Sequence, residues 1–192
     1  MFKKTFVLLF FLFFLFSCWE EDTSTESEWL KTVDKTEFSI SVPSNWEIIN
    51  NTEDILPKPN KWNIELAVAS NIAKLWFKNN LLILSDDLNS FTNSKDFSML
   101  NNLWASKDYI DYTALSSKDF TFADEEQSIL YTFEAKYNYD SPKLKFLQTA
   151  HICNQTKAFF FTIAIPASVI DTSKYEFLLQ SFKCNNVWNT EL

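Results

Sequence analysis

Apolar and polar residues alternate along several stretches of the chain, a pattern that predicts half-buried β-strands. The first stretch is FSISV at residues 38–42, where every second side chain is apolar. Pro43 stops this strand, and the PSNW turn predicts that WEII at residues 46–49 returns as its hairpin partner. NIELAVAS at residues 63–70 repeats the alternation and predicts a further strand.

Helical spacing replaces the alternation in SKDFSMLNNLWASKDY, residues 94–109. Ser94 is suited to be the N-cap, because a serine hydroxyl can accept a hydrogen bond from a free backbone N–H of the first turn. The apolar residues recur at helical spacing, as expected for a helix that covers a sheet. These residues are Phe97, Met99, Leu100, Leu103 and Trp104.

The second half of the chain predicts four consecutive antiparallel strands and a final helix. The strands are residues 113–122, 128–139, 143–153 and 157–166, separated by polar segments of hairpin length. The helix is expected at residues 173–184, where Ser173 and Glu176 have the spacing of a capping box. Strands in two runs, with one helix between them and one at the end, predict an α+β fold with an antiparallel sheet rather than a parallel βαβ fold.

The N-terminal segment has the features of a secretory signal. Lys3 and Lys4 precede an apolar run at residues 6–16, which is too short to cross the hydrocarbon core of a membrane as a helix. The run ends in Ser17 and Cys18, and this end resembles the lipobox of bacterial lipoproteins, in which the cysteine is acylated and becomes the mature N-terminus. The resemblance implies a lipid anchor at Cys18 on a cell membrane or envelope, outside the cytoplasm. A plain signal peptide and an uncleaved short anchor are the alternatives.

These features divide the chain into three parts. We expect a signal peptide at residues 1–17, the lipidated cysteine with an acidic tether at residues 18–35, and one globular domain at residues 36–192. Within the tether, Trp29 and Leu30 are the residues at which packing can begin.

The charge of the chain argues against a nucleic-acid partner. With 17 basic and 25 acidic residues the formal net charge is −8, and removal of Lys3 and Lys4 with the signal makes it −10. Nucleic-acid binding depends on basic patches that neutralise phosphates. We therefore expect the membrane, through the anchor, and an unidentified envelope protein as partners.

Glycine is absent from the sequence. P-loop, dinucleotide-binding and Gly-x-Ser-x-Gly motifs are therefore excluded, because each of them needs glycine. Backbone positions with positive φ must use other residues, of which asparagine and aspartate are the most tolerant. Turns are predicted at several of the asparagine pairs, which are Asn50–Asn51, Asn79–Asn80, Asn101–Asn102 and Asn185–Asn186.

Four segments together resemble the PsbP-like proteins, a family related to bacterial lipoproteins of the DcrB kind. They are FSISVPSNWE, NNLLILSDDLNSFTNSKDF, AHICNQTKAFFFTIAIP and YEFLLQSFKC, and they span Glu37 to Cys184. The resemblance implies an α/β/α sandwich around a central antiparallel sheet that acts as a non-catalytic accessory or binding domain. No manganese, calcium or chloride ligand set can be transferred from the family to residues of this chain.

His151 is the only histidine, so any Ser-His-Asp, Cys-His or histidine-ligated metal site has to use it. We interpret it as a strand histidine at a surface or boundary of the sheet. An extracytoplasmic hydrolase that uses His151 is the alternative. We predict no catalytic residue, no cofactor and no metal, so the protein is expected not to be an enzyme.

The acidic clusters of the chain offer a second possible metal site. Asp124, Glu125 and Glu126 are adjacent, as are Asp86 and Asp87, and carboxylate oxygens are the ligands that calcium prefers. Adjacent carboxylates in a polar turn are more often simply solvated, which is the interpretation we prefer.

Two cysteines remain once Cys18 is acylated. If the strand 157–166 returns antiparallel to the strand that ends at Cys153, the final helix runs back in the direction of that earlier strand and brings Cys184 near Cys153. An extracytoplasmic compartment permits a disulfide between them, and two free buried thiols are the alternative. The spacing is not Cys-x-x-Cys, which argues against a sulfur-based metal or redox site.

Trp62 lies in the proline-containing segment LPKPNKW. A loop tryptophan is a common anchor of protein interfaces, so Trp62 is a candidate for a partner surface. Taken together, these features predict a cell-envelope lipoprotein whose single domain acts by binding, as an assembly or stability factor of an envelope complex.

Overall fold

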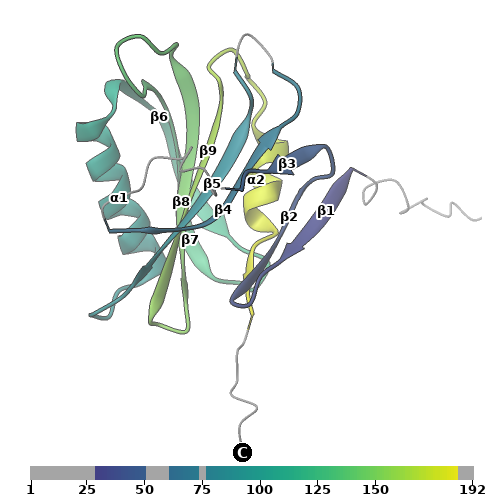
Figure 1. Cartoon of the computed structure of the whole chain (residues 1–192). Coiled ribbons are helices and arrows are strands. Elements are labelled where there is room, and N and C mark those ends of the chain that lie inside the picture. The colour runs from purple at the N-terminus through teal and green to yellow at the C-terminus, as the bar shows by residue number, and fades with distance from the viewer. Residues whose placement is uncertain (1–28, 51–60, 74–76, 186–192) are drawn as a thin grey trace, which may run out of the picture.

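The computed structural model of the chain describes residues 29–50, 61–73 and 77–185 (Figure 1). In chain order the elements are β1 (Leu30–Asp34), β2 (Phe38–Pro43), β3 (Trp46–Ile48), β4 (Asn63–Ser70), β5 (Asn80–Asp87), α1 (Ser94–Asp108), β6 (Ile110–Thr121), β7 (Gln127–Lys136), β8 (Leu144–Cys153), β9 (Lys157–Pro166), α2 (Ser173–Gln180) and β10 (Lys183–Cys184). No helix in these ranges is both long and apolar enough to cross a membrane.

The strands form two antiparallel sheets. The large sheet has the order β3-β4-β5-β9-β8-β7-β6, and the small sheet has the order β1-β2-β10. Helix α1 covers one face of the large sheet, while α2 and the small sheet lie on the opposite face (Figure 1). The predicted α+β fold, with helices on both faces of a central antiparallel sheet, is therefore confirmed.

Strand β9 is buried along nearly its whole length because both faces of the large sheet are covered. KAFFFTIAIP is accordingly apolar on both sides rather than alternating. Phe159, Phe161 and Ile163 contribute to the core shared with α2 and the small sheet, whereas Ala164 contributes to the core under α1.

The predicted hairpin between residues 38–42 and 46–49 is wrong. The turn at Ser44 and Asn45 forms, but β2 pairs with β1 and β10, and β3 pairs with β4. The turn therefore carries the chain from the small sheet to the edge of the large sheet. Alternation specifies which side of a strand is buried, but it does not specify which neighbour supplies the backbone hydrogen bonds.

The folded part of the chain begins earlier than predicted. Leu30–Asp34, which we assigned to the tether of residues 18–35, is strand β1, paired with β2 in the register Val33↔Ile40. Val33 is only 8% exposed and belongs to the core shared with α2. The domain boundary at residue 36 therefore has to move toward Trp29 and Leu30.

The positive-φ positions differ from the asparagine pairs at which turns were predicted. Among the described residues, positive φ occurs at Asp111, Glu125, Asn154 and Gln155. Asn154 and Gln155, at 52° and 59°, form the tight turn between β8 and β9, a conformation that suits the right-handed twist of hairpin strands. Asn101 and Asn102 lie inside α1, and Asn80 pairs with Ala69 within the sheet, so these turn predictions are wrong.

Helix α1 buries a different face from the one predicted. Its N-cap is Asn93 rather than Ser94, and the Asn93 side chain accepts a hydrogen bond from the backbone N–H of Asp96 at 2.9 Å. The buried residues of the helix are polar or small, whereas most of its large apolar residues are exposed. The buried residues are Ser94, Ser98, Asn101 and Ala105.

Helix α2 begins at Ser173 as predicted, but the predicted capping box does not form. Thr172 is the N-cap residue and makes no side-chain hydrogen bond to a backbone N–H of the helix. Its hydroxyl donates instead to the Glu176 carboxylate at 2.8 Å, and the Ser173 N–H donates to Asp171. The apolar residues of α2 do face the core, with Tyr175, Leu178 and Leu179 buried.

We predict that Phe182→Ala strongly destabilises the domain. Phe182 is fully buried and its ring lies 4.7 Å from the ring of Phe161 and 5.2 Å from that of Phe38, so truncation leaves a cavity between the two sheets. The free energy of unfolding in urea should fall by about 3–5 kcal/mol. The control is Phe91→Ala, at a side chain that is 78% exposed, which should change it by less than about 0.5 kcal/mol. Similar losses in both variants would contradict this packing.

Candidate functional site

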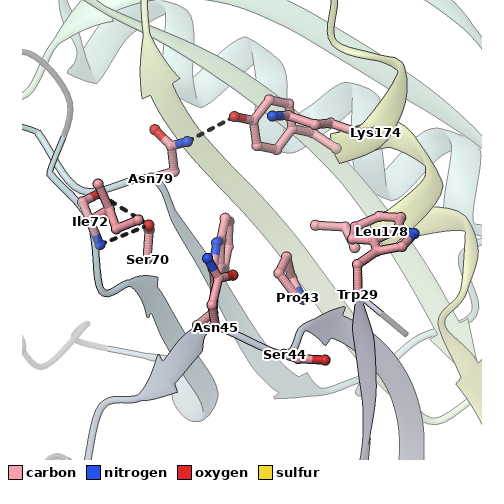
Figure 2. Close-up of a pocket in the computed structure, with 11 residues that line it drawn as sticks. Trp29, Pro43, Ser44, Asn45, Ser70, Ile72, Asn79, Lys174 and Leu178 are labelled. Carbon is pink, nitrogen blue, oxygen red and sulfur yellow. Dashed lines mark hydrogen bonds between the residues drawn. The ribbon is translucent and has the colours of Figure 1, made fainter. Parts of the chain in front are cut away.

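A groove of about 490 Å³ opens between the small sheet, β3 and α2 (Figure 2). Its apolar walls combine half-exposed Trp29 with buried Trp46 and Tyr175. Pro43, Ile72 and Leu178 complete these walls, and the polar lining residues are Ser44, Asn45, Ser70, Asn79 and Lys174. An apolar side chain of a ligand or partner can enter such a groove.

The Pro-x-x-Trp segment, residues 43–46, forms one wall of this groove. Pro43 ends β2 and Trp46 begins β3, with the turn between them. The backbone N–H of Ser44 donates to the carbonyl of Trp29 at 2.8 Å, and the Lys31 ammonium donates to the carbonyl of Trp46 at 2.5 Å. These bonds fix the turn against β1, so the start of the folded chain becomes part of the wall.

The polar end of the groove holds an amide with an unused acceptor. The Asn79 side-chain N–H donates to the hydroxyl of Tyr175 at 2.8 Å (Figure 2). The buried Oδ1 of Asn79 has no hydrogen-bond partner among the described residues. Burial raises the pKa of Tyr175, and the hydrogen bond from Asn79 opposes this only in part. Because this oxygen is buried, it is not exposed to a ligand in the groove.

The outer face of α1 is an exposed apolar surface. We call it the α1 face, and it consists of Met99, Leu100, Leu103 and Trp104, whose exposed fractions are 52%, 43%, 50% and 49%. Large side chains that are half exposed and adjacent on one helix are typical of interaction surfaces. The groove and the α1 face lie on opposite sides of the large sheet (Figure 1).

The buried serines of α1 explain why its large apolar residues face away from the sheet. Ser98 donates its hydroxyl to the carbonyl of Ile129 at 2.8 Å, and the Ser94 hydroxyl accepts from the backbone N–H of Ile152 at 2.9 Å. Ser94 also donates to the carboxylate of Glu126. Small side chains let the helix approach the sheet, and the hydrogen bonds satisfy its buried hydroxyls. Residues 94, 98, 101 and 105 themselves have helical spacing, a signal that the prediction from the apolar residues overlooked.

His151 lies inside the domain, so the prediction of a surface or boundary position is wrong. The residue is 2% exposed, and its ring is 4.7 Å from that of Phe122 and 5.1 Å from that of Phe182. Nε2 of the histidine lies 2.9 Å and 3.0 Å from the two carboxylate oxygens of Asp124. Among the described residues, the ring's hydrogen-bond partners are the Asp124 carboxylate and the two cysteine sulfurs, and no serine or threonine hydroxyl hydrogen-bonds to it.

A disulfide joins Cys153, at the end of β8, to Cys184, in β10. The Cα atoms are 5.8 Å apart, and the two sulfurs lie 3.7 Å and 3.4 Å from Nδ1 of His151. Strand β10 pairs with β2 through Cys184↔Phe38, which holds the second cysteine near the end of β8. The structure therefore brings His151 and both cysteines into one buried cluster with Asp124.

Asp124 is held in place by two donors. Besides the histidine, the backbone N–H of Cys184 donates to its carboxylate at 3.0 Å. Burial alone would raise the pKa of Asp124, but the hydrogen bonds from His151 and Cys184 outweigh it and lower the pKa below its ordinary value. Asp124 faces His151 while Glu126 faces Ser94, so these carboxylates diverge, and they do not converge as a calcium site requires.

Trp62 packs within the protein. Its ring is 5.9 Å from that of Phe97, in the first turn of α1, and 5.8 Å from that of Phe160 in β9. Trp62 is partly buried, and a role in a partner surface stays a prediction. Cys18 lies outside the described residues, as do the neighbours of Trp62 at residues 51–60.

Comparison with solved structures identifies the fold. The solution structure of the cyanobacterial PsbP protein CyanoP from Synechocystis matches with a TM-score of 0.59, covering 81% of this chain and 92% of that chain at 13% sequence identity. The fold is PsbP-like. This confirms the fold that the sequence motifs indicated, while the relation to DcrB-like lipoproteins stays a prediction.

The other comparisons are weaker. The Saccharomyces cerevisiae Ran-binding protein Mog1p matches with a TM-score of 0.47 at 10% identity, covering 80% of this chain and 94% of that chain. A crystal structure from Bacteroides thetaiotaomicron matches with a TM-score of 0.41 at 9% identity, over 79% of this chain and 46% of that chain. No protein-family model matches the chain, and no curated protein does.

The motifs that carried the resemblance have structural roles in the PsbP-like domain. The Pro43-x-x-Trp46 segment links the two sheets and lines the groove. In the closing Ser-Phe pair, Ser181 accepts a hydrogen bond from the backbone N–H of Ser41 at 3.0 Å, and Phe182 fills the core. Both motifs therefore fasten the small sheet and α2 to the large sheet.

We predict that the disulfide is present in the purified protein. Tryptic digestion without reduction should yield peptide 146–157, which contains Cys153, joined to peptide 184–192, which contains Cys184. Reduction should separate them and lower the free energy of unfolding by about 3–4 kcal/mol, because the bond closes a long loop in the unfolded chain. Recovery of both peptides separately, each alkylated before reduction, would exclude the bond.

Proposed function

We propose that this protein is a lipid-anchored protein of the cell envelope whose PsbP-like domain is non-catalytic and binds another envelope protein. The observation that carries the proposal is the α1 face, which places four large apolar side chains about half in water on one helix. Leaving them exposed has a hydrophobic cost that a partner can remove by covering them. The domain would then serve the assembly or stability of an envelope complex.

The chemistry of the α1 face favours a protein partner over a lipid surface. Helices that bind anionic membranes carry lysine and arginine on their polar side. In α1 the charged residues are Lys95, Asp96, Lys107 and Asp108, two of each sign. Lys95 is already paired with Asp119 at 2.9 Å. With a net charge of −10 after removal of the signal, the protein as a whole is repelled by anionic lipid.

The position of the N-terminus also supports a protein partner, rather than the membrane, at the α1 face. The folded chain starts at Trp29, beside the groove, on the side of the large sheet opposite α1 (Figure 1). An anchor at Cys18 would lie 11 residues before Trp29 in the sequence. The groove would then lie near the membrane, and the α1 face would point away from it.

A hydrolase that uses His151 is the second function considered. The ring is buried, and among the described residues its nitrogens contact Asp124 and the disulfide sulfurs rather than a hydroxyl group. The arrangement therefore favours binding over hydrolysis.

We predict that Cys18→Ser releases the protein from the membrane fraction. Intact-mass analysis of the wild type should show a chain that begins at Cys18 and carries acyl chains, whereas the variant should lack them. Ser24→Ala, in the tether, should leave both lipidation and fractionation unchanged. An unmodified full-length wild-type chain in the cytoplasm would refute the anchor.

We predict that the α1 face contacts the partner. A photo-crosslinking amino acid at Leu103 should capture a defined envelope protein in cells, whereas the same group at Ile170, which is 94% exposed between β9 and α2, should not. The double variant Leu100→Gln and Leu103→Gln should reduce co-purification of that protein by about tenfold or more. It should change the free energy of unfolding by less than about 0.5 kcal/mol.

The matched control for the double variant is Ile170→Gln, which removes an exposed apolar side chain from another surface and should leave co-purification unchanged. Equal capture from positions 103 and 170, or full co-purification with the double variant, would overturn the α1 face as the interface.

A further inference from the structure

Three side chains that can bind a metal meet at one point of the core. A ring nitrogen of His151 and the sulfurs of Cys153 and Cys184 all lie within 4.8 Å of one another. The two sulfurs form a disulfide, and the imidazole lies beside it. We propose that reduction of this disulfide creates a zinc site in which His151, Cys153 and Cys184 are the protein ligands. The disulfide and the zinc complex are then alternative states of one cluster.

The distances between the ligand atoms already match a zinc site on two of three edges. Tetrahedral zinc with Zn–N near 2.0–2.1 Å and Zn–S near 2.3 Å requires nitrogen-to-sulfur separations of about 3.5 Å. Nδ1 of His151 lies 3.4 Å from the sulfur of Cys184 and 3.7 Å from that of Cys153. The remaining edge, between the two sulfurs, has to open to about 3.8 Å, which cleavage of the covalent bond permits.

Asp124 orients the imidazole for this role. Its carboxylate accepts the Nε2–H of His151, so in the neutral ring the lone pair is on Nδ1, the nitrogen that faces the sulfurs. A carboxylate on the far nitrogen of a ligating histidine is the usual outer partner in zinc sites. Asp124 is itself fixed by the backbone N–H of Cys184, which couples its position to one of the ligand residues.

The surroundings suit a compact, nearly neutral metal centre. Two thiolates balance the charge of Zn²⁺, and the rings of Phe122 and Phe182 pack against the histidine and exclude water from that side. Cys153 is buried, whereas Cys184 is partly exposed, in the two-residue strand β10. The opening at Cys184 provides a path for a reductant and for the ion, and three protein ligands leave one position for water.

The conversion balances with a dithiol reductant. The reductant supplies two electrons and two protons and becomes a disulfide, while Cys153 and Cys184 become two thiols. Binding of Zn²⁺ then releases both thiol protons to solvent, because the thiolate is the ligand. A disulfide oxidant reverses the sequence: it accepts two electrons from the thiolates and two protons from solvent to become a dithiol, while the Cys153–Cys184 bond re-forms and the ion is expelled. The state of the cluster therefore depends on the thiol and disulfide reagents around it.

Cobalt(II) titration of the purified full-length protein in detergent tests the site. The protein is first reduced with a phosphine, which takes an oxygen atom from water and becomes a phosphine oxide. Reduced wild type should bind one cobalt per chain with a sulfur-to-cobalt charge-transfer band, and zinc should displace it. The oxidised wild type should show no such band. The Cys18→Ser variant, which keeps only Cys153 and Cys184 as cysteines, should behave like the wild type once it is reduced.

Two variants separate this site from adventitious thiolate binding. Asp124→Asn keeps the shape of the outer partner but lowers its basicity, so zinc affinity measured against a chromophoric chelator should fall by about 10–100-fold. His151→Ala removes a ligand and should lower the affinity by at least about tenfold. Circular dichroism of both oxidised variants checks that they are folded.

Absence of the charge-transfer band in reduced wild type would overturn the proposal. Wild-type affinity in a folded His151→Ala variant would also overturn it, because the two cysteines would then bind the ion without the histidine. If His151→Ala fails to fold, Asp124→Asn decides, and an unchanged zinc affinity in that variant rejects the site.

Discussion

The ring of Phe182 fills the space between the two sheets, and most of the domain depends on this contact. It packs against Phe38 of the small sheet and Phe161 of the large sheet, and also against the imidazole of His151. Phe182, two residues after the end of α2, therefore joins the last helix, the small sheet and the large sheet into one core. Because the small sheet has only short strands and few backbone hydrogen bonds of its own, this aromatic packing and the disulfide at Cys184 hold it in place.

The same packing sets the properties of the buried cluster. His151 is kept dry by aromatic rings, and the only hydrogen-bonding groups that reach it among the described residues are Asp124 and the two sulfurs. With Nε2 at the Asp124 carboxylate, the imidazole directs Nδ1 toward the two sulfurs, an arrangement that suits metal ligation. A structural disulfide and a latent zinc site are thus compatible with one arrangement of side chains, and the redox state separates them.

Helix α1 illustrates a constraint of a different kind. Its serines and alanine face the sheet because hydrogen bonds to Ile129 and Ile152 and close backbone approach outweigh burial of its larger side chains. Both faces of the helix have helical spacing, so periodicity alone could not decide between them. The apolar α1 face is left in water, which is why the function we propose is binding, and why it rests on α1 rather than on a catalytic centre.

Sequence patterns were enough to predict four features, because alternation, polar turns and chain direction are local signals. These features are the α+β class, the closing meander β6 to β9, the final helix and the proximity of Cys153 and Cys184. Three other features became clear only from the folded chain: β2 and β3 belong to different sheets, β1 is part of the fold, and α1 buries its serines. The cluster of Asp124, His151 and the cysteines could not be predicted from the spacing of these residues in the sequence. Its members come from separate strands and a turn, and contacts between distant segments depend on which elements pack together, a quantity that no local pattern contains.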